Sequence, residues 1–416
     1  MQMMTSFLQY FTSILTPSSY FCNCYFRIFM RNKNNHFAGA ILVFCSLSFS
    51  NIAVNGQEQT TIDSIKNKPS AKEVFQKISE NVQLGGWIDA QYQYEKNDDA
   101  EKNFFQIRRA RLDVKGSLSK WVDFRLQADF APNPRLIDAF VKVNFCKYVK
   151  LQAGQFKIPF SLENILSPLD LEFTENAQVI SALSGYKDVT GISSYANGRE
   201  IGLMLTGTLA SSEVKGEKIP ILQYGVGVFG GNGINVKTDN MAKDLSGRIL
   251  ITPFLKGLTI SASGYYGRYD MQLNGAATGV DGNRRRAAAG VQYDEHNLIV
   301  RSEYLWGTTD FAYYDADLDK IKPTAVYTHG AYVTVGYWFR FGWGKNCNVQ
   351  QKLRPALRVD YYEKDLSKEK ASLYYSVGVD WWPEKHLRMQ VNYTLKQQMK
   401  VMPLDHLFTA MLSVKF

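Results

Sequence analysis

Charged side chains, three of them positive, occupy every second position from Arg109 to Lys115 in the stretch NFFQIRRARLDVKG, residues 103–116, with Asp113 as the acidic member. Successive side chains of a strand point to opposite faces, so Arg109, Arg111 and Lys115 would share one face while Ala110 and Leu112 share the other. Arginine suits oxyanions such as phosphate, because its planar guanidinium donates two parallel hydrogen bonds. The pattern predicts a strand with a cationic, water-facing side that can bind anions.

The same chemistry is repeated on later segments. Arg125 and Lys142 occupy the polar side of two neighbouring alternating stretches, and Lys157 stands at the root of a long connection. With Arg109 and Arg111 they form the first set of candidate anion ligands. Further cations fall on the polar side of segments spread through the rest of the chain: Arg248, Arg301, Arg340, Arg354, Arg358 and Arg388.

Acidic side chains share the same polar side and oppose this interpretation. We expect cross-strand pairs of Arg109 with Asp129 and of Arg125 with Asp113, which would neutralise those arginines. The long connection adds Glu163, Asp170, Glu172 and Glu175, which could turn cations toward themselves. The residues alone therefore leave open whether a net positive constriction exists.

Alternating segments that could position these cations continue to the last residue, Phe416. Several reach about ten residues, the length of a tilted strand that crosses a membrane. We expect about sixteen strands, at residues 82–94, 104–116, 121–130, 136–145, 149–158, 199–210, 221–230, 245–253, 258–269, 286–295, 297–307, 328–341, 351–362, 371–382, 387–397 and 405–416.

One face of each segment is apolar and the other polar. Phe124 and Leu126, for example, alternate with Asp123, Arg125 and Gln127. A soluble β-sandwich also alternates, but the strand length, an export signal and the pattern of connections favour a transmembrane antiparallel β-barrel. A closed sheet pairs every backbone group in lipid without leaving an edge. The apolar face would contact lipid and the charged face would line a water-filled interior.

The connections alternate in length along the chain. Those that follow even-numbered strands are mostly short: Ser117–Lys120, Cys146–Tyr148, Phe254–Gly257 and Pro383–His386, with Ser211–Pro220 and Gly342–Gln350 as longer exceptions. Those that follow odd-numbered strands include Pro159–Gly198, Gly231–Asp244, Asp270–Arg285 and Thr308–Tyr327. Short turns at one end and long loops at the other are typical of outer-membrane barrels.

The first part of the chain predicts export. Residues 30–56 form a signal peptide: Arg31 and Lys33 give it a positive start, residues 37–49 are apolar, and Val54 and Gly56 are small residues before the cut. An anchoring helix is the alternative for this stretch. We expect residues 1–29 to be a mis-assigned upstream extension, 57–81 a flexible periplasmic segment and 82–416 the barrel.

Composition excludes several other classes of protein. The net charge of +9 lacks a long basic block, since Arg284–Arg286 is a single short run, so nucleic acid is not an expected partner. A mean hydropathy of −0.24 argues against a bundle of membrane helices. The histidines show no metal spacing, and we expect neither a metal nor a cofactor. Cys146 and Cys347 should lie half a barrel apart and not pair.

Several stretches resemble the phosphate-selective porin O and P family: FFQIRRARLDVKG, FRLQADFA, DAFVKVNF, LQAGQFKIPFSLE, GREIGLMLTG and GGNGINVKTDNMAKDLSGRI. The resemblance covers roughly residues 82–416. It implies a sixteen-stranded porin of the bacterial outer membrane, often trimeric, with a basic, anion-selective channel. It also implies that the loop after the fifth strand folds into the lumen, and that loop corresponds to Pro159–Gly198.

The combined expectation is an outer-membrane porin, not an enzyme, for passive diffusion of phosphate or similar small anions. A general, non-selective porin is the first alternative. An outer-membrane hydrolase would need a catalytic cluster, for which His329 near Asp310, Asp315 and Asp317 is the best candidate. A barrel scaffold whose lumen is plugged by residues 159–198 is the third.

Overall fold

The computed structural model describes residues 81–97, 100–186, 189–190, 198–214, 217–237, 242–253, 255–273, 276–315, 317–318, 320–342, 350–366, 371–399 and 404–416. All of them belong to the second of two compact units, Ala71–Phe416. The upstream extension and the signal peptide expected from the sequence lie outside the described residues. So do Cys347 and all but the last residue of the expected periplasmic segment. Cys146 is a free thiol in a short turn.

Strands dominate the described part of the chain: β1 (Val82–Lys96), β2 (Glu101–Ser117), β3 (Val122–Asp129), β4 (Arg135–Asn144), β5 (Lys150–Lys157), β6 (Arg199–Val214), β7 (Glu217–Phe229), β8 (Asp244–Ile251), β9 (Leu258–Leu273), β10 (Ala276–Glu295), β11 (Leu298–Asp315), β12 (Lys320–Tyr337), β13 (Phe339–Gly342), β14 (Gln350–Glu363), β15 (Ala371–Glu384), β16 (Leu387–Gln398) and β17 (Asp405–Lys415). A 3-10 turn, η2 (Glu163–Ile165), and a short helix, α5 (Gln178–Leu183), lie between β5 and β6.

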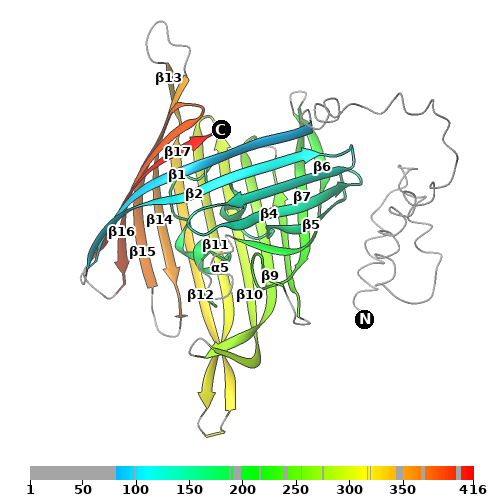
Figure 1. The fold of residues 1–416 in the computed structure, drawn as a ribbon, viewed down its shortest axis with the longest axis vertical. Helices are drawn as coiled ribbons and strands as arrows, with labels where there is room; N and C mark the ends of the chain where they lie inside the picture. The colour runs from blue at the N-terminus through cyan, green and yellow to red at the C-terminus, as the bar shows by residue number, and fades with distance from the viewer. Residues whose placement is uncertain are drawn as a thin grey trace, which may run out of the picture. The chain divides into compact units, whose positions relative to one another are not determined.

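These strands form one closed antiparallel sheet, with β1 paired to both β2 and β17 (Figure 1). Trp338 separates β12 from β13, and both pair with β14, so they act as one strand of the wall. The fold is therefore the sixteen-stranded barrel that the sequence predicts. Gly86 and Phe416 close the seam with two backbone hydrogen bonds of 3.0 and 3.1 Å.

The two faces of the wall differ as the alternation predicts. On β16, Arg388 and Gln390 are buried, whereas Met389 and Val391 are 38% and 44% exposed. The buried polar face points inward, because the opposite face carries the exposed apolar side chains. Among the described residues, no helix is both long and apolar enough to span a membrane.

The strands on one side of the barrel are longer than predicted. The expected loops Asp270–Arg285 and Thr308–Tyr327 are mostly strand, leaving only residues 274–275 between β9 and β10 and residues 316–319 between β11 and β12. Ser211–Pro220 is likewise reduced to residues 215–216. Outside the lipid a hairpin needs no apolar face, so these extensions lack the alternation that marks a membrane strand.

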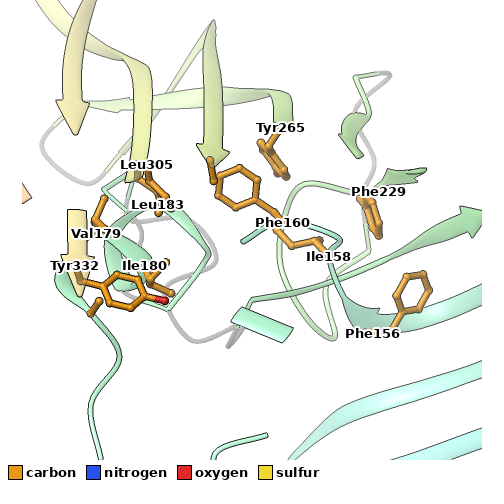
Figure 2. Packing of buried hydrophobic residues seen from close by; sticks show 13 residues of the cluster. Phe156, Ile158, Phe160, Val179, Ile180, Leu183, Phe229, Tyr265, Leu305 and Tyr332 are labelled. Atoms are coloured by element: carbon orange, nitrogen blue, oxygen red, sulfur yellow. The ribbon is translucent and has the colours of Figure 1, made fainter. Parts of the chain in front are cut away.

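The connection between β5 and β6 contributes an apolar cluster. Phe160, Ile180 and Leu183 are fully buried and gather with Leu305 of β11 and Tyr332 of β12, as Figure 2 shows. Side chains of the same connection contact many other inward-facing residues of the wall. We call residues 158–186 the β5–β6 segment.

The orientation of the wall predicts which cysteines would react with a reagent confined to the hydrocarbon phase. Leu126 is 48% exposed and its neighbour Gln127 is 1% exposed. Leu126→Cys should therefore be labelled in lipid vesicles and Gln127→Cys should not. Val377 and Ser376 on β15, 49% and 2% exposed, provide a second matched pair. Labelling of Gln127→Cys and Ser376→Cys instead would invert the assignment of the faces.

Candidate functional site

A β-bulge in β2 brings two consecutive arginines to the inward side of the wall. The pairing with β1 shifts so that Asp89 faces Arg109 while Ala90 faces Ile107, which leaves Arg108 as the extra residue. Arg108 donates to Gln91 on the inward face of β1 and Arg109 to Asp89. Strict alternation would have placed Arg108 in lipid.

Cross-strand register decides which carboxylate each arginine of β2 contacts. Arg111 is opposite Asp129 of β3 and donates to it at 2.8 Å, with both side chains buried. Arg109 is opposite Asp89 of β1 and pairs with it at 3.0 Å. The expected pair of Arg109 with Asp129 is therefore wrong, because Arg111 occupies the facing position.

The expected pair of Arg125 with Asp113 is confirmed. Nε and Nη2 of Arg125 donate to the two carboxylate oxygens at 2.8 and 3.0 Å. Nη1 of Arg125 also lies 3.4 Å from Asp138 of β4, which in turn pairs with Arg199 of β6 at 2.6 Å. Four strands of the wall, β2, β3, β4 and β6, thus share one network of charges.

A cavity of about 250 Å³ opens beside this network. Four cations line it: Arg111, Arg125, Lys157 and Arg199. The remaining lining residues come from β1, β3, β4, β5 and the β5–β6 segment: Trp87, Gln127, Asp138, Phe140, Gln152, Phe156, Ile165, Ser167 and Pro168. Three cations that the sequence singled out, Arg111, Arg125 and Lys157, are brought together here.

Lys157 differs from the arginines of the cavity in its partners. Its ammonium donates to the backbone carbonyls of Asn164 and Leu166, each at 2.6 Å. Among the described residues, no carboxylate hydrogen-bonds to it. The lysine therefore lines the cavity while it holds the start of the β5–β6 segment.

Other inward cations bind the β5–β6 segment mainly through its main-chain carbonyls. The pairs are Arg248 with Ser161, Arg388 with Pro168 and Leu171, Arg354 with Asp170 and Leu171, Arg108 with Thr174, Arg358 with Glu175, and Arg286 with Leu183. A carbonyl oxygen carries partial negative charge, so each contact is a charge-assisted hydrogen bond. These cations set the path of the segment.

Two acidic residues of the segment also form ion pairs with cations of the wall, as the sequence suggested. Glu172 pairs with Arg301 at 2.8 Å and with Arg354 at 3.0 Å, and all three side chains are buried. Burial alone would raise the pKa of Glu172, but the two guanidiniums hold the pKa below its ordinary value. Glu175 pairs with Arg108 at 2.6 Å.

A carboxylate of the wall fixes the tight turn at the start of the segment. Glu303 of β11 accepts hydrogen bonds from the Ser161 hydroxyl and from the backbone N–H groups of Leu162 and Glu163. Ser161 has a φ of 67°, in the left-handed region that residues other than glycine rarely adopt. The carboxylate compensates for this strained conformation by satisfying the buried donors of the turn.

Two predicted cations lie apart from the cavity. Lys142 is opposite Asp123 and Gln152 on the inward side of β4, nearer the short turns. Arg340 is exposed on β13. The assignment of these residues, and of Arg248, Arg301 and Arg358, as anion ligands stays a prediction.

Sequence reasoning missed Arg108, Arg199, Arg284 and Arg286. Arg108 was hidden by its bulge, although an arginine on a lipid-facing position is costly enough to signal one. Arg199 lies at the first residue of β6, where an expected loop gives way to strand. Arg284 and Arg286 are buried on β10, inside the run that the sequence presented only as a short basic block.

His329 does not assemble the catalytic cluster considered from the sequence. Its ring bonds to Glu363 and Tyr304, each at 3.1 Å. Asp310 accepts instead from Asn283. Within the described residues no group of three His, Cys, Asp or Glu could hold a metal ion.

Comparison with protein families identifies the chain. The family "Phosphate-selective porin O and P" matches residues 81–416, which include the whole barrel. The chain therefore belongs to this family, and it is a porin of the outer membrane. No curated protein sequence matches it.

Solved porins share the fold at low sequence identity. An anion-selective porin from Comamonas acidovorans is 11% identical with a TM-score of 0.56, covering 80% of this chain and 99% of that one. OmpF of Salmonella typhi, in complex with daunomycin, is 16% identical with a TM-score of 0.56, covering 81% and 98%. OmpT of Vibrio cholerae in its trimer form is 10% identical with a TM-score of 0.54, covering 80% and 99%.

The burial of Glu163 in the segment predicts a pH dependence of stability. Burial raises the pKa of this carboxyl to about 7, against the opposing effect of Arg358 and Arg301. The folded protein then keeps the proton up to about pH 7, whereas the unfolded chain loses it near pH 4.5. The free energy of unfolding should fall as pH rises through this window, by up to about 3 kcal/mol.

Glu163→Gln should flatten this slope, because the amide still accepts from Ala177 N but does not titrate. Urea unfolding in lipid vesicles at several pH values would measure it. Glu172→Gln is the matched control: the pKa of Glu172 lies below its ordinary value, so its removal lowers stability without changing the slope above pH 4.5. An unchanged slope in Glu163→Gln would contradict the assignment.

Proposed function

We propose that this member of the phosphate-selective porin O and P family forms a water-filled channel through which phosphate or similar small anions diffuse passively. Inward-facing arginine and lysine side chains would favour anions over cations. Family membership supports transport by a porin. The observation that carries the anion preference is the charge of the cavity beside β2–β6.

The charge of that cavity depends on Lys157. Arg111, Arg125, Lys157 and Arg199 line it. The carboxylates that pair with them are Asp113, Asp129 and Asp138. Three arginines face three carboxylates, so a net positive charge at the cavity requires Lys157, which bonds to two backbone carbonyls, to keep its proton.

Arg125 is the cation of the cavity that a passing anion can reach most easily. Its side chain is 33% exposed, whereas that of Arg111 is 3% exposed. An oxyanion could share its guanidinium with Asp113 for a short time and then leave. Conduction requires such weak, exchangeable binding, since a tight site would trap the solute.

The contacts of the β5–β6 segment support its location across the lumen, where it would narrow the channel. Glu175 pairs with Arg108 of β2, and Glu172 pairs with Arg301 of β11. In a ring of sixteen strands, β2 and β11 lie on nearly opposite sides. Contacts with both inward faces support a path that crosses between them.

A general, non-selective porin is the second candidate, and the ion pairs favour it. Arg109, Arg301, Arg354 and Arg388 each contact a carboxylate. If the remaining charges also balance, the channel would discriminate only by size.

For the assembly, we propose a homotrimer, supported by the family resemblance and by the trimer form of the structurally similar OmpT.

Planar-bilayer recordings in a salt gradient would test the selectivity. The purified protein should conduct, with a reversal potential that shows anion preference. Lys157→Gln and Arg125→Gln should each shift that potential toward cations, and the shift should shrink at high salt as the charges are screened. Arg285→Gln, an outward-facing control, should leave it unchanged.

The outcomes separate the candidates. Cation preference, or no shift in either inward variant, would leave the porin and remove the anion selectivity. An absence of conductance in the intact protein would favour the plugged scaffold. Phosphate and chloride compared in the same membrane would show which anion passes more readily.

A further inference from the structure

Two arginines face away from the lumen. Arg285 is exposed on β10, between the buried and inward-facing Arg284 and Arg286. Arg268 is exposed on β9, the adjacent strand of the wall (Figure 1). Both lie on the side of the wall that contacts lipid along most of its height.

The two arginines are neighbours across the strand pair. Arg285 is opposite Tyr266, and Arg268 is opposite Asn283, so the arginines occupy diagonal positions of the β9–β10 ladder. Diagonal positions lie about 7–8 Å apart at the backbone. Two long side chains at that spacing can converge on one phosphate group.

Their height in the membrane matches the headgroup level of a lipid leaflet. Arg285 lies ten residues from the end of β10, and Arg268 lies ten residues from the start of β9, both counted from the short-turn end. A tilted strand climbs about 25 Å in ten residues, the height of the apolar band of an outer-membrane barrel. Because short turns face the periplasm, this level belongs to the outer leaflet.

Charge compensation from the protein is incomplete at this level. Arg285 makes no hydrogen bond or ion pair within the part of the chain that the structure describes. Arg268 bonds weakly to the Tyr266 hydroxyl, at 3.4 Å, and Asp281 offsets part of its charge, whereas Arg285 has no such neighbour among the described residues. Asp270 and Asp281 face each other one row further from the membrane. A guanidinium at the membrane surface without a protein partner attracts the phosphate of an anionic lipid.

The surface beneath the arginines has room for an acyl chain. The outward side chains there are small and exposed: Ala262, Gly264, Ala287 and Ala289. At Gly264 an added Cβ would meet its nearest atom only at 3.9 Å. The small residues leave space for the acyl chain, while the two arginines would bind the phosphate of the headgroup.

We propose that Arg285 and Arg268 bind the phosphate headgroup of an outer-leaflet lipid on the outer wall of the barrel. The lipid sits outside the channel and stabilises the β9–β10 side of the wall in the membrane. This site is separate from the proposed passage of anions through the lumen, so either can hold without the other.

Native mass spectrometry of protein released from nanodiscs would test the site. The nanodiscs contain phosphatidylcholine with bisphosphorylated lipid A as the probe. The intact protein should retain lipid A. Arg285→Ala should reduce the retained fraction about fivefold, the effect expected for one cation at a membrane surface. Arg285→Glu combined with Arg268→Ala should abolish retention.

Two controls follow. One compares an arginine near the short turns with the proposed pair, and the other compares free phosphate with lipid phosphate. Arg340→Ala removes an exposed arginine near the short turns and should retain lipid A as the intact protein does. Inorganic phosphate added to the nanodiscs should not displace the lipid, and displacement would point to a free-phosphate site instead. Equal retention by the intact protein and the double variant would overturn the proposal. Bilayer conductance of the Arg285 and Arg268 variants should be unchanged.

Discussion

The hydrocarbon of the membrane offers no partner to a backbone N–H or C=O group, and this constraint organises the whole molecule. Every strand of the wall is paired on both sides because β1 joins β17, with Gly86 and Phe416 at the seam. In the closed sheet, the alternation of side chains places apolar residues against lipid on the outside and polar residues against water on the inside. The inward face can carry buried charge only because each charge finds a partner there.

Two parts of the wall use their cations differently. From β10 to β16, Arg286, Arg354 and Arg388 donate to main-chain carbonyls of the β5–β6 segment and secure it. From β2 to β6, Arg125 and Arg199 border an open cavity and share Asp138. The same residue type therefore serves as scaffold on one side and as candidate ligand on the other. The difference follows from where the segment lies, since a cation that already holds a carbonyl has fewer donors left for a solute.

The barrel and its strand positions were predictable because contact with lipid on one face and water on the other imposes strict alternation. That reason disappears beyond the membrane, where β9–β12 continue as hairpins in residues expected to be loops. The pair of Arg125 with Asp113 was predictable from nearby positions, whereas Asp129 binds Arg111 because a partner depends on register, which local sequence does not specify. Arg108 escaped prediction because one bulge reverses the face of a residue. The partners of Arg354 and Arg388 lie far along the chain and required the folded structure.

Main-chain oxygens from Ser161 to Leu183 hold the β5–β6 segment at several points, in addition to its buried side chains. A carbonyl is the same in every amino acid, so the contacts made by Arg388 and Arg358 do not depend on which side chains the segment carries. Substitutions at its few less buried positions, such as Asp170, would leave these main-chain contacts in place, whereas Phe160, Ile180 and Leu183 are buried in the apolar cluster. The path of the segment is therefore set partly by backbone atoms, and changes in surface side chains can alter its chemistry while those contacts remain.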